Sequence, residues 1–168
     1  MTDPETTSVV RVTINEQRAE RVVEARQLLV HFIRETLALK GTHIGCDTGN
    51  CGACTVLLDG QPVKSCMLLA AQVDGSTIET VESLSAAGGE LSDLQRAFNE
   101  QHALQCGWCT PGMLIQAKSL LERDPDPEVD TIRRCLKGNI CRCTGYVNIV
   151  RAIQQAAGQD VTAGKVDA

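Results

Sequence analysis

The chain has 168 residues, a formal net charge of −5 and an apolar share of 43%. This length suits one domain of ordinary size or two small ones, and an acidic chain without a Lys/Arg run is not typical of a nucleic-acid-binding protein. The longest apolar run, near residues 67–71, is too short to span a membrane, and the polar start MTDPETTS does not resemble a secretory signal. We therefore expect a cytoplasmic protein.

The N-terminal half is predicted to form a small α+β domain over residues 9–81, after a polar tail at 1–8. Residues 9–23 have the pattern of two short strands joined by a turn at Asn15 and Glu16. An apolar stripe over residues 27–37 predicts a helix. Residues 53–66 predict a hairpin that turns at Asp59 and Gly60, and residues 76–81 predict a last strand. Strands around a single helix indicate an α+β domain.

The C-terminal half is predicted to be helical throughout, after a linker of small residues at 82–90. Ser92 can cap a helix that runs to about residue 103. Thr110 and Pro111 form a good N-cap and N1 pair for a second helix to about residue 123. A third helix is expected to end at Gly138, and Thr144 can cap a fourth to about residue 157. The helical domain is thus predicted over 91–158, followed by a tail at 159–168.

The nine cysteines are the strongest functional signal in the sequence. The cytosol keeps thiols reduced, so disulfides are rare there. An odd number of cysteines, with a single residue between Cys141 and Cys143, also fits a disulfide framework poorly. Metal binding is therefore the better interpretation.

The first group of cysteines lies in GCDTGNCGAC and is completed by a thiol eleven residues later. Its spacing is that of the plant-type ferredoxin ligands for a [2Fe–2S] cluster. The four residues are Cys46, Cys51, Cys54 and Cys66. Such a cluster is anionic and needs backbone N–H donors around it, and the glycines of the loop allow that close approach. A four-cysteine zinc site is the alternative, although its usual pair spacing is matched only in part.

The second group of cysteines lies in CGWC and CRC. It consists of Cys106, Cys109, Cys141 and Cys143. Each pair closes just before a predicted helix start, where unpaired N–H groups and the helix dipole favour negative charge. Zinc is again the alternative. The neighbouring ferredoxin-type loop favours a second [2Fe–2S] cluster, because a chain with one redox centre has a use for another.

The remaining candidates have weaker signals. Cys135 lies on the apolar face of its predicted helix and is expected to be a small buried packing residue. His31, His43 and His102 are expected to be surface or packing residues, and Trp108 a hydrophobic lid. The sequence has no Ser/His/Asp set and no phosphate-binding glycine loop. We therefore expect no substrate chemistry on this chain itself.

The motifs GCDTGNCGACTVLLDG, QCGWCTPGM and GNICRCTGYVNIVRAI together resemble the small iron–sulfur subunit of the molybdenum hydroxylases, the xanthine oxidase family. The resemblance covers about residues 9–157, with all motifs in order. Within the family the chain is most similar to small subunits of bacterial N-heteroaromatic hydroxylases of the quinoline 2-oxidoreductase type. The small subunit of aerobic carbon monoxide dehydrogenase is the alternative.

The resemblance implies a ferredoxin-like β-grasp domain that holds the first cluster and faces a medium subunit with FAD. It also implies a four-helix-bundle domain that holds the second cluster and faces a large subunit with the molybdopterin cofactor, which Gln105 and Cys143 would contact. Electrons would pass from molybdenum through the helical-domain cluster and the ferredoxin-like cluster to FAD. The family leads us to expect a dimer of heterotrimers.

Two functions of other classes stay open at this point. A free-standing ferredoxin-type carrier would not need the helical half. A zinc-stabilised interaction module would be colourless, whereas iron–sulfide centres are red-brown. The resemblance favours an electron-transfer subunit of a molybdenum-containing oxidoreductase over both.

Overall fold

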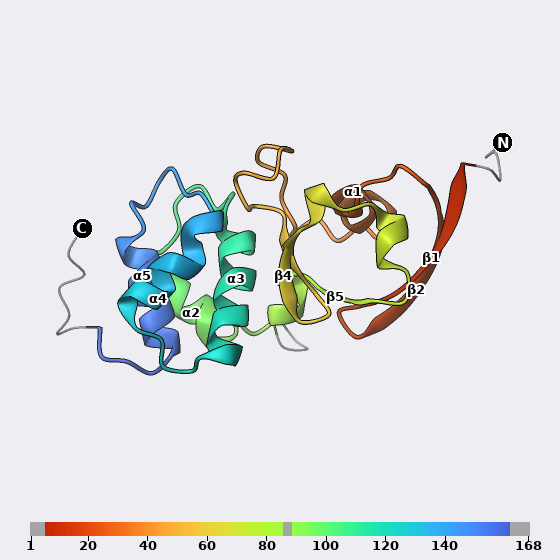
Figure 1. The fold of residues 1–168 in the computed structure, drawn as a ribbon. Helices are drawn as coiled ribbons and strands as arrows, with labels where there is room; N and C mark the ends of the chain where they lie inside the picture. The colour runs from red at the N-terminus through yellow and green to blue at the C-terminus, as the bar shows by residue number, and fades with distance from the viewer. Residues whose placement is uncertain (1–5, 86–88, 162–168) are drawn as a thin grey trace.

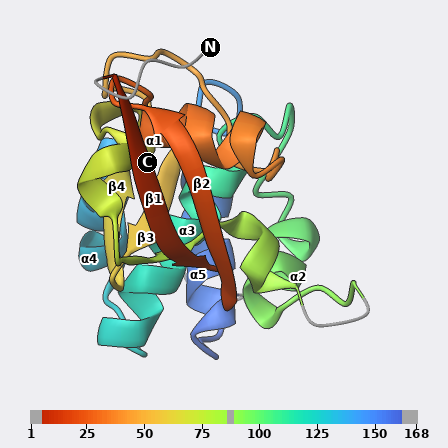
Figure 2. The same cartoon turned by 90° about the vertical axis from the view of Figure 1, so that its right-hand side faces the viewer.

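The structure, a computed structural model, describes residues 6–85 and 89–161. They form two lobes that lie side by side (Figure 1). We call the lobe from β1 to β5 the sheet domain and the lobe from α2 to α5 the helical domain. In the view turned by 90°, β1 and β2 lie in front of the helices (Figure 2).

The sheet domain contains one mixed sheet of five strands, in the order β2-β1-β5-β3-β4. The strands are β1 (Thr7–Ile14), β2 (Gln17–Glu24), β3 (Thr55–Leu58), β4 (Gln61–Lys64) and β5 (Thr77–Glu79). β1 pairs antiparallel with β2 and parallel with β5, while β3 pairs antiparallel with both β4 and β5. Both predicted hairpins are confirmed, and the residues of both two-residue turns have positive φ, as the twist of tight hairpins requires.

One short helical segment packs on this sheet. It consists of α1 (Leu29–His31) followed directly by a π-helical turn, Phe32–Thr36. Leu29, Phe32 and Ile33 are fully buried in the same core as the inward-facing side chains of β1, β3 and β5. The helix predicted over 27–37 is confirmed in position, although half of it is a wide π turn. A sheet that curves around one helix is the expected β-grasp arrangement.

The helical domain contains four helices around one apolar core, as predicted. They are α2 (Asp93–Glu100), α3 (Thr110–Arg123), α4 (Val129–Cys135) and α5 (Val147–Ala156). The core is built from side chains of all four helices, which include Phe98, Met113, Ile132, Ile149 and Ile153. Short 3₁₀ turns occupy Ser65–Met67, Ala70–Val73, Val81–Leu84 and Leu136–Gly138.

Two predicted helix caps are wrong. Thr110 is already the first residue of α3, and the N-cap is Cys109. Thr144 lies well before α5, whose N-cap is Tyr146 in the left-handed conformation with φ of 70°. The hydroxyl of Thr144 accepts the N–H of Tyr146 at 3.2 Å and contacts Cys141 Sγ at 3.2 Å. These bonds form a turn of their own, so the helix begins after it.

The helix ends are nearer to the predictions, and the Ser92 cap of α2 is confirmed. α2 stops at Glu100, before the predicted residue 103, because His102 adopts a positive φ of 51° that no α-helix accommodates. α4 ends at Cys135 and continues as a 3₁₀ turn to Gly138. α5 ends at Ala156, one residue before its predicted end.

The two domains meet where α3 lies against β3 and β4. Val81 and Leu84, in the 3₁₀ turn after β5, pack against the core of the helical domain. Residues 86–88 of the predicted linker lie outside the described part of the chain, so the predicted domain limits stay predictions. Within residues 6–85 and 89–161, no helix combines the length and the apolar character that crossing a membrane requires.

Candidate metal centres

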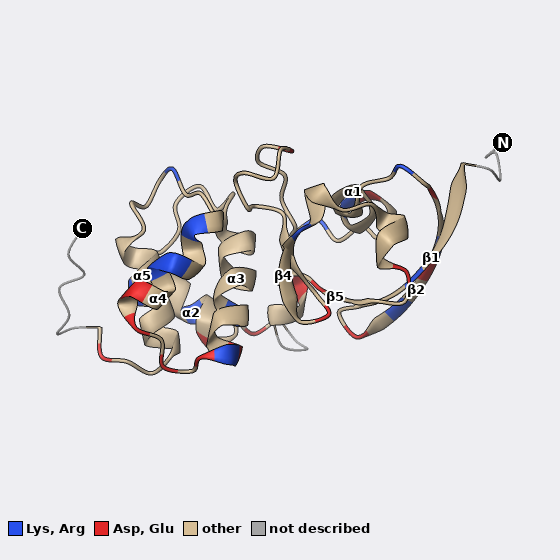
Figure 3. Ribbon diagram, viewed as in Figure 1, with Lys and Arg blue, Asp and Glu red and all other residues tan. Residues whose placement is uncertain are grey.

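The loops that carry most of the cysteines lie on one side of the molecule, close to the junction of the two domains (Figure 1). We call Cys46, Cys51, Cys54 and Cys66 the sheet-domain centre. We call Cys106, Cys109, Cys141 and Cys143 the helical-domain centre. These loops contain few charged residues, and over the rest of the fold Lys and Arg are interspersed with Asp and Glu (Figure 3).

In the sheet-domain centre, the backbone of the loop after α1 wraps around Cys46. Cys46 Sγ accepts the backbone N–H of Thr48 at 3.4 Å and that of Cys51 at 3.3 Å. A hydrogen bond from the Thr48 hydroxyl, followed by these two backbone bonds, lowers the pKa of the Cys46 thiol to about 6. Gly45 lies against the same cysteines, because a Cβ there would be 2.9 Å from Cys51 Sγ. The loop thus stabilises a thiolate by hydrogen bonds.

The other thiols of this centre lie deeper in the fold. Cys54 and Cys66 are only 3% and 5% exposed. Burial and the adjacent thiol of Cys54 raise the pKa of Cys66 to about 11, and the charge of Cys46 adds to the shift. Three of the four predicted ligands therefore affect one another directly, and Cys51 joins them through its N–H bond to Cys46.

The helical-domain centre brings together two cysteine pairs from distant parts of the chain. Cys143 Sγ lies 3.5 Å from Cys106 Sγ. Burial, followed by the neighbouring thiol of Cys141, raises the pKa of Cys109 to about 12. The four thiols form a second group, as the sequence predicts.

Local hydrogen bonds hold the Cys141 side of this centre. Burial by itself would raise the pKa of Cys141, but bonds from the Thr144 hydroxyl and from backbone N–H groups lower it below its usual value. The Tyr146 hydroxyl accepts the N–H of Cys141 at 2.9 Å. Of the two pairs, only the first closes directly at a helix start: Cys109 caps α3, whereas the turn of residues 144–146 separates Cys143 from α5.

The donor set fits a [2Fe–2S] cluster at each centre. Four cysteines are the usual ligand set of such a cluster, and backbone N–H groups bonded to sulfur suit its negative charge. The thiols contact one another in pairs, as shown by Cys54 with Cys66, Cys109 with Cys141, and Cys106 with Cys143. Across the part of the chain that the structure describes, no three His, Cys, Asp or Glu side chains converge as a single metal ion requires.

Comparisons with known families agree with this geometry. Residues 12–85 match the family described as 2Fe-2S iron-sulfur cluster binding domain, and residues 80–154 match the [2Fe-2S] binding domain family. Caffeine dehydrogenase subunit gamma from Pseudomonas sp. strain CBB1 is 48% identical over 152 residues, which cover 89% of this chain and 90% of the relative.

Solved structures give the same answer. The quinoline 2-oxidoreductase structure from Pseudomonas putida 86 contains a chain that is 47% identical, with a TM-score of 0.88 over 90% of this chain and 93% of that chain. The chain belongs to the small iron–sulfur subunits of the molybdenum hydroxylase family. The same fold also forms 17% of a longer chain in the aldehyde oxidoreductase of Desulfovibrio gigas, at 37% identity and a TM-score of 0.85 over 90% of this chain.

In this iron–sulfur subunit, the loops of the two centres are hydrogen-bonded to each other. The N–H of Ile140, next to Cys141, donates to the carbonyl oxygen of Cys51 at 2.8 Å. Asn139, only 3% exposed, donates its side-chain amide to the carbonyl oxygen of Gly52 at 3.0 Å. Asn139 was not predicted from the sequence, where its one available signal is its position two residues before Cys141.

Trp108 forms a second connection between the domains of the subunit. Its indole N–H donates to the carbonyl oxygen of Ile44 at 3.1 Å, and its ring stacks on that of His43 with centroids 4.5 Å apart. His43 Nδ1 also lies 3.0 Å from the carbonyl oxygen of Trp108. Trp108 is 52% exposed. The side chain therefore spans the domain boundary, its role as a hydrophobic lid stays a prediction, and His43 is a packing residue as expected.

The two residues predicted to contact molybdopterin lie next to each other. Gln105 is exposed, and its side-chain amide donates to the carbonyl oxygen of Cys143 at 3.1 Å. Their contact with a cofactor stays a prediction. Cys135 was expected to be buried, but it is only half-buried. Its Sγ accepts a hydrogen bond from the side-chain amide of Gln116 on α3 at 3.2 Å.

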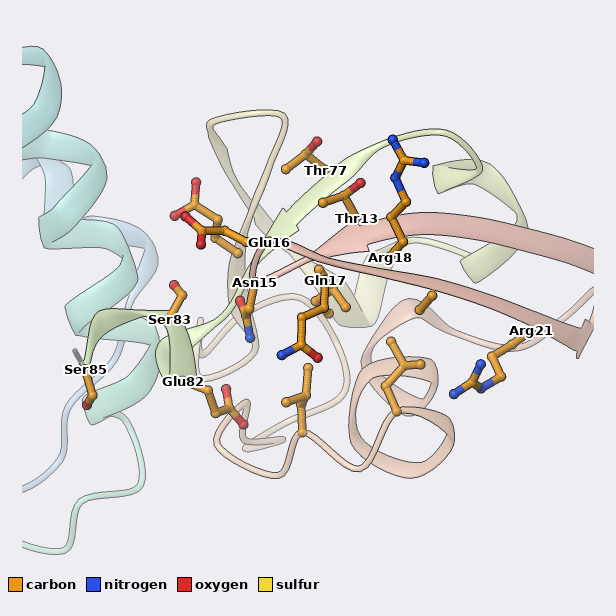
Figure 4. A pocket seen from close by; sticks show the side chains of 15 residues that line it. Thr13, Asn15, Glu16, Gln17, Arg18, Arg21, Thr77, Glu82, Ser83 and Ser85 are labelled. Atoms are coloured by element: carbon orange, nitrogen blue, oxygen red, sulfur yellow. The ribbon is translucent and has the colours of Figure 1, made fainter. Parts of the chain in front are cut away.

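A surface hollow of about 770 Å³ lies on the sheet domain of the subunit, between the β1–β2 turn and the 3₁₀ turn after β5 (Figure 4). Its wall is about equally polar and apolar and includes Asn15, Gln17, Glu82 and Ser83. No cysteine lines it. The hollow is therefore separate from both candidate metal centres.

Proposed function

We propose that this subunit carries one [2Fe–2S] cluster at each centre and conducts electrons between two partner subunits. The ligands would be the four cysteines of each centre, with no substrate chemistry on this chain. When bound, each cluster would accept and release one electron at a time. The chain itself would hold the thiolates, surround them with N–H donors and fix the path between them.

The backbone hydrogen bond from Ile140 to Cys51 is the observation that carries this proposal. It links a peptide adjacent to one ligand of the helical-domain centre with a ligand of the sheet-domain centre. The link consists of covalent bonds and a single hydrogen bond of 2.8 Å, and it runs through a part of the interface where Asn139 is buried. Such a short connection suits electron transfer between the two centres.

The ends of this path would face the partners. Exposed Gln105, bonded to Cys143, would contact the molybdopterin cofactor of a large subunit. Trp108 and Ile140 are 52% and 53% exposed beside the helical-domain centre, and Met67 is 61% exposed beside Cys66. These exposed apolar side chains would contribute to the contacts with the partners. Electrons would pass from molybdenum through the helical-domain and sheet-domain centres to FAD on a medium subunit, in a dimer of heterotrimers.

The relatives indicate the substrate class of the whole enzyme. Caffeine and quinoline, for which two of them are named, are aromatic compounds with a ring nitrogen, and both relatives are more similar to this chain than the aldehyde oxidoreductase. We therefore favour hydroxylation of an N-heteroaromatic compound by the large subunit, with water as the oxygen source. Aerobic carbon monoxide dehydrogenase is the second candidate. A cysteine set without disulfides, eight of whose members are the proposed cluster ligands, supports a cytoplasmic location, where disulfides are rare.

The test of the electron-transfer function uses the native complex, purified without oxygen. We expect iron without zinc and two distinct [2Fe–2S] signals in the EPR spectrum after reduction with dithionite. Cys51→Ser should abolish one signal and Cys109→Ser the other, while the control Cys135→Ala should retain both. Zinc in place of iron, or a single signal in the native protein, would refute the proposal.

The composition of the complex tests the partners. We expect a large molybdenum subunit and a medium FAD subunit to co-elute with this chain during gel filtration. Elution as a free chain of 18.1 kDa would instead support a free-standing carrier. Turnover of quinoline or caffeine, compared with that of carbon monoxide, decides between the two enzyme classes.

A further inference from the structure

Lys64 lies at the end of β4, two residues before Cys66, and points into the loop of the sheet-domain centre. Its Nζ donates to the carbonyl oxygen of Gly49 at 2.5 Å, in a partly buried position. Gly49 lies between Cys46 and Cys51, and its own N–H bonds to Cys66 Sγ. One residue of this loop, Gly49, therefore separates the Lys64 ammonium from the sulfur of Cys66, a predicted ligand.

The same ammonium lies close to the chain that leads into the helical-domain centre. A Cβ placed on Gly138 would be 3.8 Å from both Nζ and Cε of Lys64. Gly138 lies three residues before Cys141. Lys64 thus occupies the boundary between the two centres, with its direct hydrogen bond on the sheet-domain side.

No carboxylate neutralises this charge in the described part of the chain. The ion pairs found there involve other Lys and Arg residues, and none includes Lys64. By contrast, Lys118 at the same domain boundary bonds to both Glu79 and Glu122. Lys64 is therefore a fixed positive charge whose one polar partner is the backbone of the ligand loop.

A positive charge at this place acts on the reduction potential. Reduction adds one negative charge to a centre that is already anionic, so a nearby cation stabilises the reduced form more than the oxidised form. The bond to the Gly49 carbonyl oxygen holds the ammonium at the loop of the sheet-domain centre. The charge therefore raises the potential of the sheet-domain centre more than that of the helical-domain centre, because its hydrogen bond lies on the sheet-domain side.

We propose that Lys64 is a positioning and charge-tuning residue that raises the reduction potential of the sheet-domain centre relative to the helical-domain centre. Electrons that arrive from the helical domain would then be drawn toward the sheet domain. The proposal rests on the function proposed above, since it requires a redox centre in each domain.

The test is a redox titration of the native complex, with each centre followed by its EPR signal. Lys64→Gln removes the charge but keeps a donor for Gly49, and Lys64→Met removes both, whereas Lys64→Arg keeps both. For Lys64→Gln we expect the ratio of reduced to oxidised sheet-domain centre, measured at a fixed potential, to fall roughly tenfold. This corresponds to a reduction potential that is lower by about 59 mV for one electron. The helical-domain centre should shift less, and Lys64→Arg should stay near the wild type.

Arg18→Met is the matched control, because it removes one cation from β2, at the opposite edge of the sheet from β4. It should leave both potentials unchanged. If Lys64→Gln and Lys64→Met retain both EPR signals at wild-type potentials, the role of Lys64 is refuted while the two-centre function stands. Equal shifts of both centres would also refute it. Failure to find two iron–sulfur signals in the wild type would instead refute the function itself.

Discussion

At the scale of single residues, Gly52 shows why the ligand loop of the sheet-domain centre is rich in glycine. Its φ of 73° is a conformation that residues with a side chain adopt only with strain. A Cβ would also collide with the carbonyl oxygen of Gly138 and would lie 2.8 Å from the side chain of Asn139. Two independent reasons therefore disfavour a side chain at this position: the backbone conformation, and the helical domain that packs against it.

We predict that Gly52→Ala lowers the thermal unfolding midpoint much more than Gly60→Ala does. Gly60 has a similar φ of 77°, but nothing lies within 4 Å of a Cβ there. Gly60→Ala should cost about 1 kcal/mol of backbone strain, and Gly52→Ala about 3 kcal/mol, because it also separates the packed loops. Thermal unfolding followed by the visible absorbance of the clusters measures both, and equal losses would contradict the packing argument.

At the scale of elements, neighbouring residues in the sequence determine where α2 begins, but they do not determine where α5 begins. Ser92 and Gln95 form a capping box, in which the Ser92 hydroxyl accepts the Gln95 N–H at 3.3 Å and Gln95 Oε1 accepts the Ser92 N–H at 2.9 Å. The start of α2 was therefore predictable from two residues. The start of α5 was not, since the Thr144 hydroxyl bonds to Cys141 Sγ and leaves Tyr146 as the N-cap of the helix.

Ser92→Ala should destabilise the helical domain by about 1 kcal/mol, because it leaves the Gln95 N–H without its partner. Ser92→Thr keeps the hydroxyl and should be nearly neutral. Thermal unfolding of the two variants provides the comparison. A loss as large for Thr as for Ala would mean that packing around Ser92, and not the cap, is what matters.

At the scale of the whole molecule, the two domains are held together by contacts of unequal strength. Asn139 is buried and bonds to the carbonyl oxygen of Gly52 at 3.0 Å and to the Thr55 hydroxyl at 3.4 Å. Lys118 of α3 bonds to Glu79 of β5 at 3.0 Å in a partly exposed position. Burial would lower the pKa of Lys118, but its bonds to Glu122 and Glu79 raise it, so the lysine stays charged at neutral pH.

We expect Asn139→Ala to weaken the docking of the domains far more than Lys118→Met. The first change removes two buried hydrogen bonds across the boundary, worth about 1 kcal/mol each, and leaves a cavity between the packed loops. The second removes a partly exposed ion pair, worth less than about 1 kcal/mol. Hydrogen exchange of the β3 amides and the magnetic interaction between the two reduced centres would report the docking. A larger effect for Lys118→Met would reverse this ranking.

The sequence by itself determined the features that depend on neighbouring residues. The cysteine spacing from Cys46 to Cys66 indicated the kind of cluster, and Asp59 with Gly60 indicated a hairpin, because a ligand loop and a tight turn are set by local backbone conformation. Helix patterns located the four-helix half in the same way. These patterns cover a few residues each, so they need no knowledge of the rest of the fold.

Only the tertiary structure decided how these pieces meet. Asn139 and Gly52 lie 87 positions apart along the chain and touch because α3 packs on β3. The places of Lys64 between the centres and of Trp108 across the boundary follow from the same packing. Contacts of this kind depend on which apolar faces of the helices and the sheet pack together. Short-range sequence patterns do not indicate this packing.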